Sequence, residues 1–120
     1  MKGFVANIEQ EAQGNEAFRK VIFTAQHSQL VLMSLKPGEE IGEEVHDTLD
    51  QFFRFESGQG KVVIEGEEAA IGDGSVVVIP AGTKHNIINT SSDVALKLYT
   101  IYSPPNHQDG TIHQTKEEAE

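Results

Sequence analysis

The stretch GDGSVVVIPAGTKHNIIN, residues 72–89, carries the strongest structural signal in this sequence. Its apolar run at 76–79 is bounded by Gly72-Asp73-Gly74 on one side and by Pro80-Ala81-Gly82 on the other, and both tripeptides are typical of tight turns. A second apolar run starts at His85. We therefore predict two short strands joined by a tight turn, with His85 placed where a rigid strand begins and a side chain can still face a pocket.

The same pattern extends over the rest of the chain. Short apolar runs alternate with Gly, Pro, Asp and Ser at intervals of about ten residues, which is typical of an all-β sandwich or barrel. We expect one domain over residues 1–120, with a barrel core at about 18–102, an N-terminal arm at 1–17 and a C-terminal tail at 103–120. Strands are expected at 18–25, 28–35, 40–46, 51–58, 61–66, 68–72, 75–80, 85–90 and 94–102.

Several of these strands are apolar on both faces, as in 30–33 and 76–79. A sheet with a single buried face would show alternating apolar and polar residues instead. Because the sequence offers little helix to cover a second face, we expect another copy of the chain to cover it, and we predict a homodimer.

The composition excludes several classes of protein. Nineteen acidic residues against nine scattered Lys and Arg give a net charge of -10, so the chain should repel nucleic acid. There is no cysteine, which excludes disulfides and thiolate chemistry and fits a reducing compartment. No apolar run is long enough for a membrane span or a signal peptide, so we expect a cytoplasmic protein without membrane contact.

A histidine surrounded by carboxylates occurs in the segment EEIGEEVHDTLDQFFRF, residues 39–55. On a strand, Glu44 and His46 project to the same side, and Gln51 re-enters beside them if the next strand starts there. Asp50 and Asp47 are rival carboxylates in the intervening turn. Taken singly, each of these residues is as well explained as a solvated surface group, so periodicity alone leaves a metal site open.

Spacing across both segments resembles the two motifs of the cupin superfamily, in particular small single-domain bacterial cupins grouped with mannose-6-phosphate isomerase-like proteins. The first motif of that family is matched in spacing by Gly38, Glu44, His46, Gln51 and Gly58, and the second by Gly74, Pro80, Gly82, His85 and Asn89. The resemblance implies a jelly-roll barrel (a double-stranded β-helix) of two antiparallel sheets.

The resemblance also implies one divalent metal ion inside the barrel, bound by Glu44, His46, Gln51 and His85. Two positions depart from the family pattern, because Glu44 replaces a histidine and Gln51 replaces a glutamate. The number of carboxylates in the set is unchanged, so we interpret the glutamate at position 44 as compensating for the glutamate missing at position 51. Imidazole, carboxylate and amide ligands without sulfur suit Fe, Mn, Zn, Ni or Cu, and they leave the identity of the metal open.

The pocket beside this site is expected to be apolar and to take a small-molecule ligand or substrate. Phe53, Phe55 and Ile87 are its candidate wall residues. We find no cluster of basic residues that would bind a sugar phosphate, since Lys61 and Lys84 are expected at the surface. Asn89 is expected to be structural, whereas His27, His107 and His113 are expected to be peripheral, with His107 as the candidate for closing the mouth.

Two functions follow from this interpretation. In the first, the chain is a dioxygenase-like or isomerase-like enzyme acting on a small chelating oxygen substrate, with Glu44 as the candidate general base. In the second, the metal has a structural or ligand-capturing role without turnover, because a fold does not fix a function.

Overall fold

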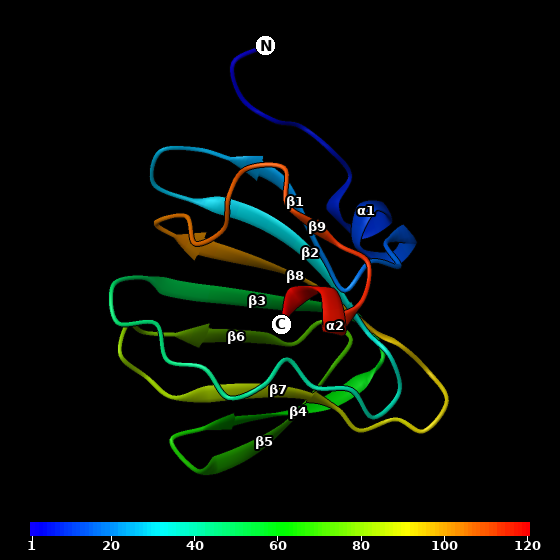
Figure 1. Ribbon diagram of the computed structural model, residues 1–120. Helices are drawn as coiled ribbons and strands as arrows, with labels where there is room; N and C mark the ends of the chain where they lie inside the picture. The colour runs from blue at the N-terminus through cyan, green and yellow to red at the C-terminus, as the bar shows by residue number, and fades with distance from the viewer.

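The computed structural model describes all residues from 1 to 120 and is built almost entirely from antiparallel strands (Figure 1). The first part of the chain forms α1 (Ile8–Gly14), β1 (Arg19–Thr24), β2 (Gln29–Leu35), β3 (Asp50–Ser57), β4 (Gln59–Ile64) and β5 (Glu67–Gly72). It is followed by β6 (Val76–Ile79), β7 (His85–Asn89), β8 (Leu96–Ser103), β9 (Ile112–His113) and α2 (Lys116–Ala119). Neither helix has the length and apolar character needed to cross a lipid bilayer.

The strands form two antiparallel sheets, as the sequence predicts. A six-stranded sheet has the order β6-β3-β8-β2-β1-β9, and a three-stranded sheet has the order β5-β4-β7. Strands far apart in the sequence become neighbours in the larger sheet, since β8 lies between β2 and β3. The predicted all-β jelly-roll architecture is confirmed.

The expected strand at 40–46 is only partly formed. Isolated bridges join Glu40 to Ile88 and Glu44 to His85, so this segment runs along β7 as an irregular fourth member of the smaller sheet. The irregularity has a local cause, because Gly42 adopts a φ of +109°, a conformation outside regular strand geometry.

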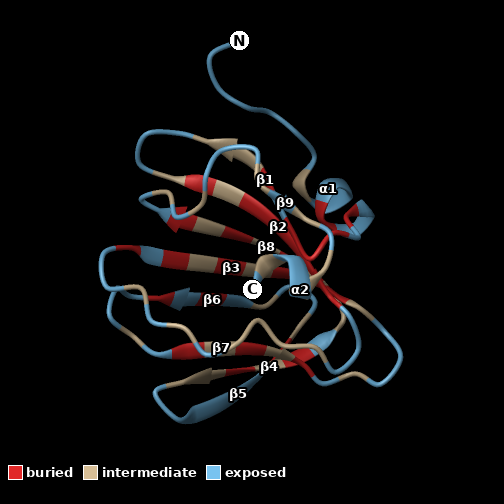
Figure 2. Cartoon of the chain, in the orientation of Figure 1, coloured by how far each residue is buried: buried red, intermediate tan, exposed pale blue.

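The core fills the space between the two sheets. Along β3, Gln51, Phe53 and Phe55 are buried, whereas Phe52 and Arg54 on the opposite face are partly exposed (Figure 2). The same alternation in β8 buries Leu96 and Leu98 along with its other inward residues. Sixteen buried apolar residues from both sheets form one cluster, as expected for strands whose side chains alternate between two faces.

The N-terminal arm and the C-terminal tail both contain short elements of regular structure. The N-terminal arm contains α1, which begins at Asn7 with the Asn7 side chain accepting a hydrogen bond from the Gln10 amide at 3.1 Å. The tail leaves the sheet at the prolines but returns as β9, which pairs with β1. The sequence Thr115 to Glu118 has the residue pattern of a capping box, which predicts one helical turn, and this turn is present as α2, where Thr115 Oγ1 accepts a hydrogen bond from the Glu118 amide.

Candidate metal centre

Three side chains from the two motif segments meet inside the barrel. The ligand atoms of Glu44, His46 and His85 all lie within 4.8 Å of one another. Glu44 Oε1 is 3.8 Å from His46 Nε2, and the centres of the two imidazole rings are 5.7 Å apart. The expectation that Glu44 and His46 project to the same side is confirmed, and the exposed Val45 between them faces away.

Backbone hydrogen bonds between the two segments bring these side chains together. The amide of Glu44 donates to the carbonyl of His85 at 2.9 Å, and the amide of His85 donates back at 3.0 Å. In the turn before β7, the amide of Gly82 donates to the carbonyl of His46 at 2.8 Å. Gly82 makes this contact with a φ of +81°, a conformation that favours glycine. The turn therefore fixes the position of both histidines.

The hydrogen bonds of His85 leave one of its ring nitrogens available. His85 Nδ1 lies 2.9 Å from the carbonyl oxygen of Thr83, which can only accept, so Nδ1 carries the proton and Nε2 has a free lone pair. His85 Nε2 is buried and has no hydrogen-bond partner, and the same holds for His46 Nε2. Buried polar atoms are normally satisfied, so two unpartnered imidazole nitrogens facing one carboxylate fit a site that takes a metal ion.

Gln51 offers a further unpartnered atom. The residue is 2% exposed, and its Nε2 donates to Thr100 Oγ1 at 2.9 Å, whereas its Oε1 is buried without a hydrogen-bond partner. The rival Asp50 points to the other side of β3, where it is exposed and its Oδ1 accepts a hydrogen bond from the Ala81 amide at 2.9 Å. Strand alternation thus favours Gln51 over Asp50, and the exposed Asp47 lies outside the cluster of three.

Tyr102 and His107 form a neutral pair next to this cluster. Tyr102 OH lies 3.3 Å from His107 Nε2, and the Tyr102 ring centre is 6.0 Å from that of His46. Burial raises the pKa of Tyr102 to about 12. Burial, assisted by the positive charge of Arg19, lowers the pKa of His107 to about 4. Near neutral pH, both groups therefore contribute hydrogen bonds and no charge.

The residues expected to form an apolar wall lie in the packed core. Phe53, Phe55 and Ile87 are at most 1% exposed. Phe53 packs its ring 6.1 Å from that of His85 and 6.3 Å from that of Phe55, measured between centres. Phe53 thus supports the candidate ligand His85 directly, and Phe55 supports Phe53.

Asn89 is structural, as predicted. Its Nδ2 lies within hydrogen-bond distance of the carbonyls of Leu35, Lys36 and Val94, at 2.9 to 3.1 Å, and its Oδ1 accepts from the Ser91 amide at 2.9 Å. These contacts fasten the end of β7 to two neighbouring loops, and they leave the side chain no role in a ligand site.

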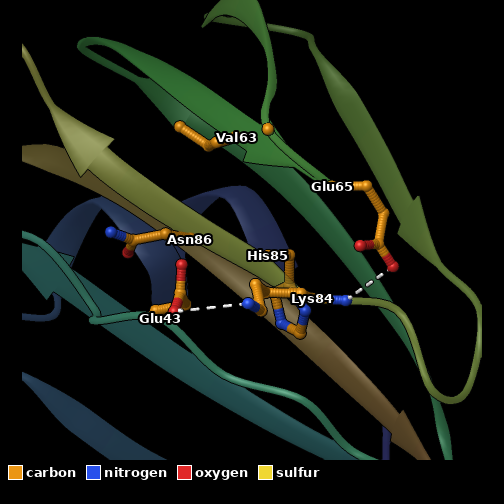
Figure 3. Close-up of a pocket in the computed structure, with 7 residues that line it drawn as sticks. Glu43, Val63, Glu65, Lys84, His85 and Asn86 are labelled. Atoms are coloured by element: carbon orange, nitrogen blue, oxygen red, sulfur yellow. Dashed lines mark hydrogen bonds and ion pairs between the residues drawn. The ribbon is translucent and has the colours of Figure 1, made fainter.

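A hollow lies beside β7 and shares His85 with the cluster, but it contains neither Glu44 nor His46 (Figure 3). It has a volume of about 370 Å³ and is lined by charged groups that are already paired. Lys84 Nζ lies 3.9 Å from Glu43 Oε1, and the Lys84 amide donates to Glu65 Oε1 at 3.2 Å. The expectation that Lys61 and Lys84 belong to the surface is confirmed, because Lys61 forms an exposed ion pair with Glu68.

Arg19 and His107 lie closer to the cluster than their places in the sequence indicate. Arg19 is only 7% exposed and lines a hollow together with Glu44 and His107. His107 lines the same hollow and its Nε2 lies 3.3 Å from Tyr102 OH, so it is not peripheral, whereas His113 is not among the lining residues and has its Nδ1 3.4 Å from Arg19 Nη1. The pairing of β9 with β1 brings the tail back to Arg19, and no local pattern in the tail indicates this return.

Comparison with known proteins gives a consistent result. Residues 31–102 match the family described as Cupin domain. The chain is 46% identical to the uncharacterized protein YrkC of Bacillus subtilis, over 98% of this chain and 66% of that protein. It is also 46% identical to an uncharacterized protein of Acanthamoeba polyphaga mimivirus, over 91% of this chain and 70% of that protein. The chain thus spans about two thirds of the length of these relatives.

A solved structure shows the same fold almost throughout. The crystal structure of BH2720 from Bacillus halodurans superposes with a TM-score of 0.96 at 45% sequence identity. The match covers 98% of this chain and 93% of that chain, so it includes both motif segments and both terminal segments with their short helices.

Proposed function

The chain belongs to the cupin family, and from that membership we propose that it binds one divalent transition metal ion through Glu44, His46, Gln51 and His85. Cupins commonly bind a metal ion and small-molecule substrates. The observation that carries the proposal is the convergence of the Glu44 carboxylate with His46 and His85, whose Nε2 atoms are buried and unpartnered. Gln51 Oε1 is a third buried, unpartnered oxygen or nitrogen atom, and we propose it as the fourth ligand. Without a cation, each of these atoms loses its hydrogen bonds to water on folding and gains nothing in return.

Hydrogen bonds with neighbouring residues orient two of these ligands. The Thr83 carbonyl fixes the tautomer of His85, and the Thr100 hydroxyl accepts a hydrogen bond from the Gln51 amide nitrogen and orients the Gln51 oxygen. Such partners fix ligand orientation in metal proteins. Two imidazoles, one carboxylate and one amide oxygen suit Fe, Mn, Zn, Ni or Cu.

We propose that the protein acts on a small chelating oxygen compound as a dioxygenase-like or isomerase-like enzyme. When bound, the metal ion would supply Lewis-acid polarisation of a chelated oxygen. Glu44 is our candidate general base, because its side chain is 31% exposed and lines the hollow at the mouth of the barrel. The packed side chains of Phe53 and Ile87 exclude water from the inner side of the cluster.

Elemental analysis of the protein purified without chelator tests the metal proposal. We expect about one transition metal ion per chain, and we expect His85→Ala to lose most of it while the far-ultraviolet circular dichroism stays unchanged. The matched control is His27→Ala, because His27 is exposed and outside the cluster. Metal content that persists in His85→Ala would contradict the ligand assignment.

Oxygen uptake and isomerisation assays with small diketones and hydroxycarbonyl compounds then test turnover. Consumption that depends on the metal and is lost in Glu44→Gln supports the enzyme. Metal that is inert and only raises the melting temperature supports the alternative, a non-catalytic cupin in which the ion holds the fold or captures a ligand.

The outer face of the larger sheet supports the predicted homodimer. Val78, Phe52, Ile101 and Leu30 are cross-strand neighbours on β6, β3, β8 and β2, and they form a continuous apolar row. Val78 is 59% exposed, and apolar rows of this kind mark contact surfaces. We expect sedimentation velocity to show a dimer that Val78→Asp dissociates, whereas Val94→Asp, a change at an exposed valine off this row, leaves it intact. The cytoplasmic location and the mannose-6-phosphate isomerase-like grouping stay predictions.

A further inference from the structure

Arg19 is a buried cation without a carboxylate partner. Its side chain belongs to a residue that is 7% exposed, and no Asp or Glu oxygen lies within the 4.0 Å of an ion pair. Its neighbours are His113 Nδ1, which lies 3.4 Å from Nη1, the Phe18 ring, whose centre is 5.3 Å from the guanidinium carbon, and the Tyr102 hydroxyl, and none of them carries a negative charge near neutral pH. The Nε atom is buried and unpartnered. Since buried charges are normally paired, the guanidinium has room for an anion.

The guanidinium borders a hollow of about 290 Å³ at the mouth of the barrel. The walls include Ile41 and His107, and the C-terminal segment adds Lys116 of α2 (Figure 1). Glu44 lines the same hollow, so the hollow adjoins the candidate metal cluster. A volume of this size suits a ligand of a few non-hydrogen atoms.

The charges around the hollow favour an anion despite the net charge of -10 on the whole chain. Lys116 Nζ lies 4.0 Å from Glu120 Oε1, which accounts for one charge of each sign. His107 Nε2 lies 3.3 Å from the Tyr102 hydroxyl, so these two side chains contribute hydrogen-bonding groups to this region. The remaining charges are Arg19 and Glu44. Together with a divalent cation they leave a positive surplus, which a ligand with one or two negative charges would balance.

We infer that the hollow binds a small 2-oxo or 2-hydroxy carboxylate, whose carboxylate pairs with Arg19 and whose remaining oxygens face the cluster of Glu44, His46 and His85. This inference rests on the proposed metal-binding function and narrows its substrate class from chelating oxygen compounds to carboxylic acids. Arginine suits the task because its planar fork binds a carboxylate through two parallel hydrogen bonds. Arg19 is therefore a ligand-binding residue that favours negatively charged ligands over neutral ones.

Two probes of nearly equal shape isolate the carboxylate. Pyruvate and 2,3-butanedione both present adjacent oxygens, but only pyruvate carries a negative charge. Each is titrated into the Mn²⁺-loaded protein at pH 7.5, with isothermal calorimetry and the water proton relaxation of bound Mn²⁺ as readouts. We expect wild type to bind pyruvate about tenfold or more tightly than butanedione, as hydrogen bonds to charged groups permit.

Variants at Arg19 test whether this side chain causes the preference for pyruvate over butanedione. Arg19→Gln should weaken pyruvate binding about 10- to 100-fold and leave butanedione unaffected, whereas Arg19→Lys should weaken it less, because a point charge remains. The matched control is Lys20→Gln, which removes the same charge from the exposed neighbouring residue of β1 and should leave both affinities unchanged. If Arg19→Gln does not fold, Arg19→Lys and the comparison of the two probes on wild type still test whether Arg19 binds the carboxylate.

The outcomes separate this inference from the proposed function. Three results would overturn the carboxylate inference in a protein that takes up Mn²⁺: equal affinity for the two probes, no binding of pyruvate, or equal pyruvate affinity in Arg19→Gln and Lys20→Gln. Each of them would still be consistent with the proposed metal site. Failure to take up Mn²⁺ or any other divalent ion refutes the metal site, and the carboxylate inference falls with it.

Discussion

Replacing His46 by phenylalanine separates a metal ligand from a structural histidine. The His46 side chain donates and accepts no hydrogen bond within the chain, and its nearest charged neighbour is Glu44 Oε1 at 3.8 Å. Phenylalanine keeps a planar ring and removes the buried, unpartnered Nε2. If the imidazole is there to bind metal, His46→Phe in metal-free protein should be as stable as wild type or more stable by about 1 kcal/mol.

The size of the expected change follows from how much bound metal raises the melting temperature. Free metal at about 100 times its Kd adds about 2.7 kcal/mol to the free energy of unfolding. For 120 residues, the entropy of unfolding is about 0.25 kcal/mol/K, so the melting temperature should rise by about 11 °C. A hundredfold loss of affinity in His46→Phe leaves about 0.4 kcal/mol at the same metal concentration, which is a rise of about 2 °C.

Differential scanning calorimetry at pH 8, with and without metal, measures both quantities. The exposed residue His27 gives the matched control, since His27→Phe should keep the full rise. The reasoning is refuted if His46→Phe also keeps the full rise. It is equally refuted if metal-free His46→Phe melts more than about 5 °C below wild type, because the imidazole would then have a structural role.

Three further changes test other parts of the structure. Gln51→Glu replaces an amide by a carboxylate. Chelator competition should then show metal affinity raised about tenfold, and the metal-free protein should be less stable because the new charge is buried. Unchanged affinity would place this side chain away from the ion. Gly58→Ala should lower the free energy of unfolding in urea by about 3 kcal/mol, because its Cβ would lie 2.6 Å from the Ala95 carbonyl oxygen. Gly110→Ala, at a φ of +75° but with open space around it, should lose only about 1 kcal/mol, and equal losses would contradict the close approach. Because His107 has a folded pKa of about 4, below its ordinary value of 6.5, only the unfolded state binds this proton between these two values. Stability should therefore fall as the pH drops from 6.5 to 4, and His107→Gln should show a shallower fall in melting temperature; identical profiles would refute this.

Much of the candidate site could be predicted because its information is local. Strand alternation places Glu44 with His46 and turns Gln51 inward while Asp50 faces solvent, and each of these relations depends only on spacing of one or two residues. The position of His85 could be predicted from the preceding turn, since Gly82 and the residues around it set where β7 begins.

Helix α1 and strand β9 could not be predicted from local patterns. Helix α1 buries only Ala12, so its seven residues contain no apolar stripe that would identify a helix. Strand β9 has two residues and exists only because β1 offers an open edge. Segments this short are stabilised by what they pack against and not by their own propensity.

Residue type and a period of two are enough to predict the candidate ligand atoms, the two-sheet architecture and the face to which each strand residue points. Which charged groups lie close together depends on contacts between distant parts of the chain. Arg19 and Lys116 lie 97 positions apart and share a hollow with Glu44 because β9 returns to β1. The physical reason is that burial and pairing set what a charge can bind, and both depend on neighbours that the chain brings in from a distance.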